Sequence, residues 1–379
     1  MTGAPVAAVD CGTNSTRLIV VDPSGTVLER IMEVTRLGQQ VDATRRLDHA
    51  AVERTVAVLR RYRQVMERHQ VGRLRVVATS AVRDATNADT FLDQAEAVLG
   101  ARPEVLLGAE EARLSFAGAT AQLPAWWAPS APTLVVDIGG GSTEVAVGSA
   151  PARGPTPLVG RASAAGAADA GLPTSRAADA GLPTSRAADA GLPTSRAADA
   201  GLPTSRAGSG AGAGVGSHLE TRPLAAVSVD VGCVRVTERL LVSDPPSIAQ
   251  LYRARQEVHR ALAETCGGLP SPSDDGWMVG LAGTVATVAM LVHGVRRYER
   301  RLVHHSVVTA DQVEEWLHRL AGEPAAQRRA ETGMVEGRHD VIVAGVLVLA
   351  EVMAYFGRTR CLVSEDDILD GLAASLRQQ

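Results

Sequence analysis

The sequence predicts an α/β protein made of two similar domains. Strand-like and helix-like segments alternate along the chain, and the same unit opens each half. That unit is a β-rich run, an aspartate, a turn of glycine and hydroxyl residues, and a returning β-rich run. Its first copy spans residues 6–21 and its second spans residues 133–148. Because 379 residues suffice for two cores, a duplicated fold is the simplest explanation of the repetition.

The first half continues in this pattern. The turn Pro23–Gly25 predicts a meandering antiparallel sheet at the start. Asp48 suits the N-cap of a long helix that reaches about residue 70, because apolar residues recur behind it at helical spacing. The elements expected next are a strand at 74–78, a helix at 88–99, a strand at 104–107 and a helix from about 110.

The second half is predicted to repeat these features. Residues 225–231 and Cys233–Thr237 are expected to form strand and turn. Helices are expected at 247–266, 311–321, 341–356 and 368–376, strands at 278–282 and 360–364, with a further helix opening at Gly283-Thr284. We expect residues 1–125, joined by the C-terminal helix 365–379, to form one domain and residues 126–364 to form the other.

A low-complexity insertion occupies residues 150–222 of the second domain. The decapeptide AADAGLPTSR occurs there four times without change, at 167–176, 177–186, 187–196 and 197–206. Each repeat contains a glycine and a proline and only one leucine, which is too little apolar surface for a packed core. We therefore expect the insertion to be disordered.

Composition removes several classes of function. The net charge of −4 gives no reason to expect nucleic acid as a partner. All 38 basic residues are arginine, so no P-loop lysine, Schiff-base lysine or protein-kinase lysine exists. The four cysteines are scattered without a CxxC pair, which argues against a zinc site and against disulfides. No signal peptide is seen, and the most apolar stretch, 341–356, is shorter than the roughly 20 residues of a membrane span. A cytoplasmic protein with no membrane partner is expected.

Two turns have the residues of phosphate-binding loops. In Asp10-Cys-Gly-Thr-Asn-Ser15, Gly12 permits a tight turn, while Thr13, Asn14 and Ser15 offer hydroxyl, amide and backbone N–H donors. Taken alone, this turn could equally be an ordinary polar hairpin. The second turn, Asp137-Ile-Gly-Gly-Gly-Ser-Thr-Glu144, is a stronger signal, because consecutive glycines let backbone amides approach an oxyanion closely. The glycine and hydroxyl residues of this loop are Gly139, Gly140, Gly141, Ser142 and Thr143.

Carboxylates flank these loops. Asp10 could hold a hydrated Mg²⁺ or position water, and Asp137 and Glu144 are hard oxygen ligands suited to the same ion. A third turn, Gly280-Leu-Ala-Gly-Thr284, lies between a strand and a helix, and its Gly283 and Thr284 offer a weaker anion site. The second loop returns into a strand, so it is not a dinucleotide-binding fingerprint.

Paired loops of this kind resemble those of the actin and hexokinase superfamily, a two-domain, duplicated ribonuclease H-like (ASKHA) fold with the active site in the interdomain cleft. The segments between the loops narrow the resemblance. In order they are Ala78-Thr-Ser-Ala-Val-Arg-Asp-Ala-Thr-Asn87, Gly108-Ala-Glu-Glu-Ala-Arg-Leu114, the second loop, and Gly232-Cys-Val-Arg235. This order is similar to that of the exopolyphosphatase and guanosine pentaphosphate phosphatase (Ppx–GppA) family, over essentially everything but the insertion.

The resemblance implies roles for individual residues. Glu111 falls at the family's catalytic base, and Arg83 at its phosphate-contacting arginine, for which a planar guanidinium is well suited. Asp137 and Glu144 match its metal-binding carboxylates, with Mg²⁺ (or Mn²⁺) as the cofactor. The substrate implied is inorganic polyphosphate or a guanosine polyphosphate, and a homodimer is allowed by the resemblance.

The sequence also departs from the family pattern. The longer members carry an additional helical C-terminal domain with an HD-type motif, which this sequence lacks, so the resemblance leaves processive action on long chains open. The family's C-terminal Ser…Leu-Arg-Glu-Gly pattern occurs here as Ser364-Glu-Asp-Asp-Ile-Leu-Asp-Gly371, without the arginine.

Three functions follow as hypotheses. The first is a Mg²⁺-dependent phosphohydrolase that releases terminal orthophosphate from polyphosphate, with pppGpp as the alternative substrate. The second is a sugar or acetate kinase of the same superfold, which the Glu-Glu-Ala-Arg motif argues against. The third is a non-catalytic sensor of (p)ppGpp or another nucleotide, which would bind without turnover.

Overall fold

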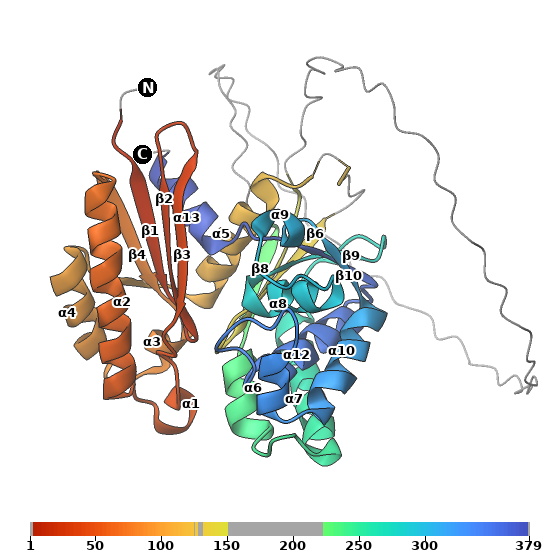
Figure 1. Cartoon of the computed structure of the whole chain (residues 1–379). Coiled ribbons are helices and arrows are strands. Elements are labelled where there is room, and N and C mark those ends of the chain that lie inside the picture. Colours follow the sequence, from red (N-terminus) through yellow and green to blue (C-terminus); the bar gives the residue numbers. More distant parts are fainter. Residues whose placement is uncertain (1–2, 125, 128–131, 151–222, 378–379) are drawn as a thin grey trace, which may run out of the picture. The chain divides into compact units, whose positions relative to one another are not determined.

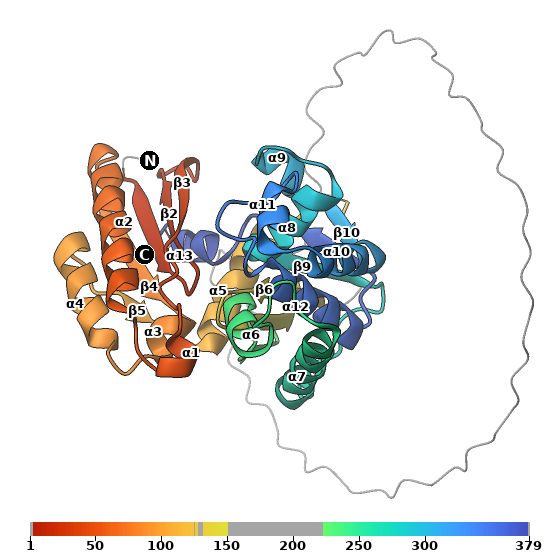
Figure 2. The same cartoon turned by 60° about the horizontal axis from the view of Figure 1, so that its bottom comes forward.

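The computed structural model describes residues 3–124, 126–127, 132–150 and 223–377, and its core consists of two mixed β-sheets with helices around them (Figures 1 and 2). The predicted insertion at 150–222 lies, apart from Ala150, outside the described residues. The boundary predicted at residue 125 stays a prediction.

The first sheet has the strand order β3-β2-β1-β4-β5. β1 pairs antiparallel with β2 and parallel with β4, β2 pairs antiparallel with β3, and β4 pairs parallel with β5. The strands are β1 (Val6–Cys11), β2 (Ser15–Val21), β3 (Val27–Val34), β4 (Arg73–Ala78) and β5 (Glu104–Val105).

The second sheet has the order β10-β11-β9-β6-β7-β8. β6 pairs antiparallel with β7 and parallel with β9, β7 pairs antiparallel with β8, and β9 pairs parallel with β11. The strands are β6 (Thr133–Ile138), β7 (Thr143–Gly148), β8 (Ala225–Val229), β9 (Trp277–Leu281), β10 (Val307–Thr309) and β11 (Arg360–Val363). Strands β8-β7-β6-β9-β11 therefore repeat β3-β2-β1-β4-β5 with the same directions, and the predicted duplication is confirmed.

Helices cover both faces of each sheet. The longest, α2, begins after Asp48, whose side chain accepts a hydrogen bond from the Ala51 amide, as expected of an N-cap. In the first half the helices are α1 (Val41–Thr44), α2 (His49–Arg68), α3 (Ser80–Asp84), α4 (Ala88–Leu99) and α5 (Gly108–Ala121). In the second they are α6 (Cys233–Leu240), α7 (Ile248–Cys266), α8 (Ala282–Val292), α9 (Arg300–Val303), α10 (Ala310–Gly322), α11 (Ala325–Ala330), α12 (Ile342–Tyr355) and α13 (Ile368–Arg377).

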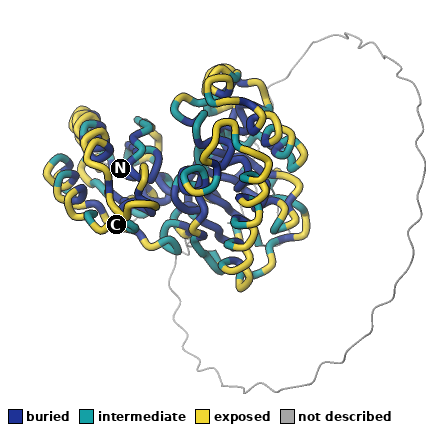
Figure 3. Tube along the Cα trace, turned by 90° about the horizontal axis from the view of Figure 1, so that it is seen from below, coloured by how far each residue is buried: buried dark blue, intermediate teal, exposed yellow. Residues whose placement is uncertain are grey.

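The alternation of side chains along each central strand builds a core on both sides of each sheet. In β1, Ala7 and Val9 pack with α2 and α4, whereas Val6 and Ala8 pack with α13. In β6, Leu134 and Val136 face α7, α8 and α12, and Val135 faces α5. The buried segments of the chain are accordingly the strands and the inner sides of the helices (Figure 3).

Two glycines allow α5 and α13 to touch through their backbones. A Cβ on Gly118 of α5 would lie 1.9 Å from the Asp367 carbonyl oxygen, and a Cβ on Gly371 of α13 would lie 2.3 Å from the Leu114 carbonyl oxygen. Since α5 also packs on the second sheet and α13 on the first, this crossing joins the two sheets.

One predicted element is wrong. Cys233–Thr237 was expected to form strand and turn, but it belongs to helix α6. The alternating Val234 and Val236 suggest a strand, yet in α6 Val236 joins the core of the second sheet and Val234 packs with Cys233 and Val341. Short elements such as α1, α3, α9, α11 and β10 were not anticipated. Within the described ranges, no helix is both long and apolar enough to cross a membrane.

Candidate active site

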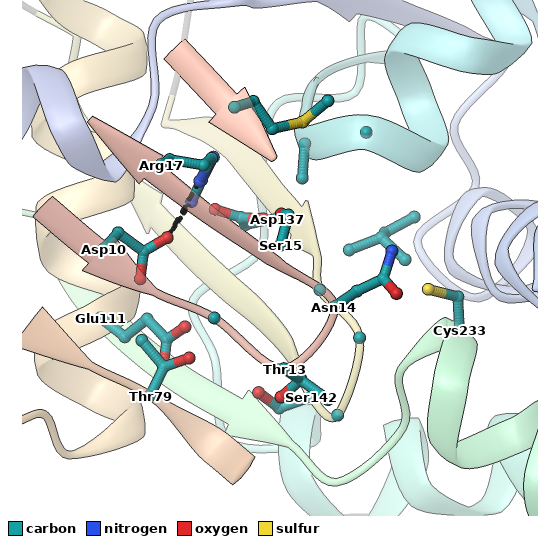
Figure 4. A pocket seen from close by; sticks show the side chains of 18 of the residues that line it. Asp10, Thr13, Asn14, Ser15, Arg17, Thr79, Glu111, Asp137, Ser142 and Cys233 are labelled. Atoms are coloured by element: carbon teal, nitrogen blue, oxygen red, sulfur yellow. Dashed lines mark hydrogen bonds and ion pairs between the residues drawn. The ribbon is translucent and has the colours of Figure 1, made fainter. Parts of the chain in front are cut away.

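Both predicted phosphate loops border one cavity of about 80 Å³ (Figure 4). Side chains of Asp10, Asp137 and Glu111 enter this space from β1, β6 and α5. The cavity is lined by Asp10, Gly12, Thr13, Asn14, Ser15, Arg17, Met32, Thr79, Glu111, Asp137, Ile138, Gly139, Gly140, Gly141, Ser142, Cys233, Ala282, Gly283 and Arg338.

The first loop is closed by a hydrogen bond and tied from behind. The Gly12 amide donates to the Ser15 carbonyl oxygen at 3.0 Å. The Asn14 carbonyl accepts from the amides of Thr35 and Arg36, and the Thr13 carbonyl accepts from another amide of the same segment. Because these carbonyl oxygens are held away from the cavity, backbone N–H groups are left to face an anion.

The second loop has the same construction. The Gly139 amide donates to the Ser142 carbonyl oxygen at 3.0 Å, and the carbonyls of Gly139 and Gly140 accept from the first amides of α6. Gly140 is needed because a Cβ there would lie 2.9 Å from the Thr13 Cβ of the first loop. The two loops therefore interdigitate, and their spacing depends on a missing side chain.

Asp10 is paired with an arginine that the sequence analysis did not single out. Arg17 donates two hydrogen bonds to the Asp10 Oδ2, at 2.6 and 2.9 Å, and also pairs with Asp367 at the start of α13. The Asp10 Oδ1 is buried and has no hydrogen-bond partner among the described residues. Arg17 follows Ser15 by two positions on β2, so strand periodicity could have placed it beside the loop.

Among the residues that the structure describes, the side chains that hydrogen-bond to Asp137 and Glu144 are those of serines. The Ser115 hydroxyl of α5 donates to the Asp137 Oδ2 at 2.8 Å, and the Ser228 hydroxyl of β8 donates to the Glu144 Oε1 at 2.8 Å. Burial raises the pKa of Asp137 to about 6, although the Arg17 charge opposes the rise. Burial, and next to it the Asp137 charge, raises the pKa of Glu144 to about 8. Glu144 lies behind the loop and does not line the cavity.

Glu111 lies in the first turn of α5 and lines the cavity. Burial raises the pKa of Glu111 well above its ordinary value, and the carboxylates of Glu144, Asp10 and Asp137 raise it further. The cation that opposes this rise is Arg83, whose Nη1 lies 3.6 Å from the Glu111 Oε2. Arg83 also donates to the Leu106 carbonyl oxygen at 2.9 Å and is not part of the cavity lining. Arg83 therefore lies beside Glu111 and outside this cavity, and its predicted contact with phosphate stays a prediction.

The carboxylates fit a divalent cation that is shared with a phosphorylated ligand. Within the described ranges, no group of three or more His, Cys, Asp or Glu is arranged to hold a metal by itself. Mg²⁺ is commonly held by one or two carboxylates together with phosphate oxygens and water. The Asp10 Oδ1 has no partner among the described residues, and the pKa values of Asp137 and Glu144 are raised, because these buried acids lack enough positive charge around them. A divalent cation would supply that charge.

The remaining predicted residues divide into two groups. Gly283 lines the cavity, and the Arg338 guanidinium lies against it, because a Cβ there would be 1.7 Å from the Arg338 Nη2. Thr284 is buried and hydrogen-bonded to the Cys233 thiol, and the Thr143 hydroxyl donates to the Val231 carbonyl oxygen. Thr143 and Thr284 therefore stabilise the walls and do not face the cavity.

Arg338 is the second arginine missed by sequence reasoning. It is 6% exposed, no carboxylate among the described residues pairs with it, and its Nη2 lies 3.7 Å from the Met32 Sδ. Burial lowers its pKa. Arg338 precedes α12, far along the chain from both loops, and its neighbouring residues give no local signal of a site. Thr79 and Cys233 also line the cavity without having been predicted.

A larger cavity of about 530 Å³ adjoins the first and shares Arg17, Met32 and Arg338 with it. Its other charged walls carry Arg30 and Arg300 opposite Glu365 and Asp367. Its apolar walls are formed by Ile31, Met32, Ala286, Val335 and Leu369, with Tyr298 beside them. This composition can accept an anion and an apolar or aromatic group together.

Comparison with known proteins identifies the family. The model of the Ppx/GppA phosphatase family matches residues 18–155 and 215–377. Exopolyphosphatase 2 of Mycobacterium tuberculosis is 34% identical over 387 aligned positions, which cover 98% of each chain. A guanosine-5'-triphosphate,3'-diphosphate pyrophosphatase of Aeromonas hydrophila is 37% identical over 146 positions, which cover 38% of this chain and 28% of that protein.

Solved structures agree. The crystal structure of an exopolyphosphatase-like protein has a TM-score of 0.76 at 30% identity, covering 99% of both chains. The Aquifex aeolicus member of the Ppx/GppA family has a TM-score of 0.67 at 23% identity, covering 99% of this chain and 98% of that one. The predicted two-domain, actin-like fold is thereby confirmed, as is the prediction of an enzyme of the phosphatase class. The chain belongs to the Ppx/GppA phosphatase family.

Proposed function

We propose that this enzyme releases the terminal orthophosphate of inorganic polyphosphate by attack of a water molecule on the end phosphoryl group. The observation that carries the proposal is the position of Glu111, a buried carboxylate that borders the same cavity as two amide-lined loops. A carboxylate beside a phosphate site can activate water, whereas phosphoryl transfer to a sugar would need a site for the acceptor.

Glu111 serves as the general base. Its pKa is raised by burial and then by neighbouring carboxylates, so it binds the proton of the attacking water more readily than an exposed glutamate would. Its Oε2 has no hydrogen-bond partner among the described residues and is free to accept from water. The Arg83 Nη1 lies 3.6 Å from the Glu111 Oε2; its charge opposes the rise in the pKa of Glu111, and its position orients the carboxylate.

The loops bind the phosphoryl oxygens. The amides of the first loop, with the Thr13 and Ser15 hydroxyls, act on one side of the cavity, and those of Gly139–Ser142 act on the other. Arg17 and Arg338 add positive charge at the junction with the larger cavity. A linear polyanion can thus place its end group in the small cavity and its next phosphates along these arginines.

Asp10 and Asp137 would hold the Mg²⁺ ion, or Mn²⁺ in its place, together with substrate oxygens. When bound, the ion neutralises charge that develops on the phosphoryl oxygens. Glu144 lies behind Asp137 in the register of the hairpin and would strengthen the negative field at the metal without touching the ligand in the small cavity.

The larger cavity favours a second candidate substrate, pppGpp. Its apolar walls and Tyr298 could receive a purine base, while Arg30 and Arg300 could bind the additional phosphates. However, both arginines already pair with carboxylates, Arg30 with Asp370 and Arg300 with Asp366. A nucleotide would have to compete with these pairs, which is why polyphosphate is the first choice.

The test is phosphate release from polyphosphates of defined length and from pppGpp, with and without Mg²⁺. Wild-type enzyme should release orthophosphate from polyphosphate in a metal-dependent manner. Glu111→Gln should lower the turnover number by about 10²–10⁴-fold, the range for loss of a general base, while leaving its folding and substrate binding intact. Unchanged release by Glu111→Gln would remove Glu111 as the base. Tight binding of (p)ppGpp without any release would support a sensor instead.

A further inference from the structure

The backbone of α6 supports the second phosphate loop from behind. The amides of Cys233 and Val234 donate to the carbonyls of Gly139 and Gly140 at 3.0 and 2.8 Å, and the Arg235 amide donates to Gly140 at 3.1 Å. The approach is close, since a Cβ on Gly232 would lie 2.4 Å from the Gly140 carbonyl oxygen. The start of α6 and the loop therefore move as one body.

The side chain of Arg235 extends from α6 to carboxylates in the first half of the molecule. Its Nη2 forms an ion pair with the Asp84 Oδ2 at 2.5 Å, and its Nη1 lies 3.2 Å from the Asp42 Oδ1. The Arg235 side chain is 9% exposed. Burial reduces screening of these pairs by solvent, so they count for more than a surface ion pair.

Asp84 connects this contact to the chemistry. It is the last residue of α3 and directly follows Arg83, the partner of Glu111. One residue, Arg235, thus holds the glycine loop with its backbone and the helix that carries Arg83 with its side chain. The gap beside Arg235 and Asp84 measures about 10 Å³, which is too small for a phosphate. The contact is a connection and not a ligand site.

We propose that Arg235 is a positioning residue, which holds the second phosphate loop in register with Glu111 by pairing with Asp84 and Asp42. This inference rests on the proposed function. The loop binds the phosphoryl group and Glu111 activates the water, so their relative placement decides the attack geometry. Loosening the pairing should leave each binding element intact but misalign the two, and misplacement by about 1 Å can cost about 10²-fold in rate.

The experiment compares Arg235→Gln and Asp84→Asn with the control Arg239→Gln. Arg239 is also on α6 and pairs with Asp42, but its side chain is 49% exposed. Arg235→Gln and Asp84→Asn should each lower kcat about 10–100-fold with KM for polyphosphate nearly unchanged, and the double variant should be no worse than either alone. Arg239→Gln should stay near wild type, and Arg235→Lys should recover part of the loss.

A second measurement does not depend on turnover. Hydrogen exchange should increase in Arg235→Gln both at residues 80–84, which form α3, and at residues 139–142, which form the turn between β6 and β7, and should stay unchanged in Arg239→Gln. Wild-type kcat in Arg235→Gln, or exchange confined to one of the two segments, overturns the positioning role. If wild-type enzyme releases no phosphate from any polyphosphate while both segments respond together, the proposed reaction fails and the connection stands.

Discussion

The two phosphate loops occupy equivalent places in the duplicated fold but differ in charge. Asp10 is opposite Arg17 in the register of β1 and β2, whereas Asp137 is opposite Glu144 in the register of β6 and β7. The first hairpin therefore pairs its carboxylate with a cation, and the second places two acids at the same positions. The same backbone design thus holds one carboxylate whose charge is partly neutralised by a paired arginine and one carboxylate that faces a second acid, which makes the second side the stronger attractor of a cation.

The loops also differ in bulk at matching positions. Thr13 and Asn14 of the first loop correspond to Gly140 and Gly141 of the second, counting from Asp10 and Asp137. The side chains of one loop fill the space that the other leaves open, as the distance from Gly140 to Thr13 shows. Duplication followed by divergence at these positions lets two similar turns approach closely enough to share one ligand.

The largest expected effect comes from removing the charge on the second side. Asp137→Asn should weaken the apparent affinity for Mg²⁺ by about 10–100-fold, because Asp137 is hydrogen-bonded to the Ser115 hydroxyl rather than paired with an arginine and so keeps its negative charge for the ion. Asp10→Asn should weaken Mg²⁺ binding less, since Arg17 already neutralises part of the Asp10 charge. Metal titrations of the rate, with Mn²⁺ binding measured by electron paramagnetic resonance, separate the two. Equal loss of metal binding in both variants would erase the distinction between the loops.

Exchanging bulk between the loops should have the next largest effect. Gly140→Ala would bring a Cβ within 2.9 Å of the Thr13 Cβ, and we expect overpacking of about 1–3 kcal/mol in unfolding free energy together with reduced turnover. Thr13→Gly removes the side chain that the new Cβ at position 140 would meet. The double variant Thr13→Gly/Gly140→Ala should therefore be more stable than Gly140→Ala alone in denaturant unfolding, and additive losses would mean that the loops do not interdigitate in solution.

A pH dependence of stability should follow from the acidic pair. In the folded state the pKa of Glu144 is raised by burial and then by Asp137 to about 8, from 4.5. Between these two values the folded state binds the proton and the unfolded state does not, so stability without metal should fall as the pH rises from about 4.5 to 8. Thermal unfolding at several pH values checks this. Glu144→Gln should flatten the dependence, and added Mg²⁺ should oppose the fall at high pH.

The smallest effect is expected at the two equivalent connections that join β2 to β3 and β7 to β8. The connection from β2 to β3 is residues 22–26, whereas the equivalent connection from β7 to β8 is residues 149–224. Because β7 and β8 are antiparallel neighbours in register, replacing residues 151–222 by a short Gly-Ser turn should preserve kcat. Shortening the loop should stabilise the fold by no more than about 2 kcal/mol. Loss of folding would show that the insertion is needed by the second sheet.

Local pattern was sufficient to predict much of this molecule. The repeated strand–Asp–turn–strand unit predicted the duplication, and Asp48 predicted the start of α2, because each of these signals is contained in a short stretch of sequence. Both loops and Glu111 were predicted to belong to the site, and the structure brings them around one cavity.

What escaped prediction depends on contacts between distant segments. Arg338 reaches the cavity only through its packing on Gly283. The helical start of α6 arises because its amides meet the carbonyls of Gly139 and Gly140, which no local propensity encodes. The position of Arg83 beside Glu111 and outside the lining of this cavity is another contact between distant segments, and its predicted contact with phosphate stays a prediction.

The glycine-mediated crossing of α5 and α13 has a consequence for motion. At Gly118 and Gly371 the backbones of the two helices are too close to slide past each other, so the crossing is a fixed contact between the two sheets. Glu111 lies on α5 before Gly118, and Asp367, the partner of Arg17, is itself the residue whose carbonyl meets Gly118. We expect product to leave by a rotation that separates the tips of the two phosphate loops. During this rotation the crossing should keep Glu111 at a fixed distance from Arg17, so each catalytic cycle has to re-form only the contact between the loops.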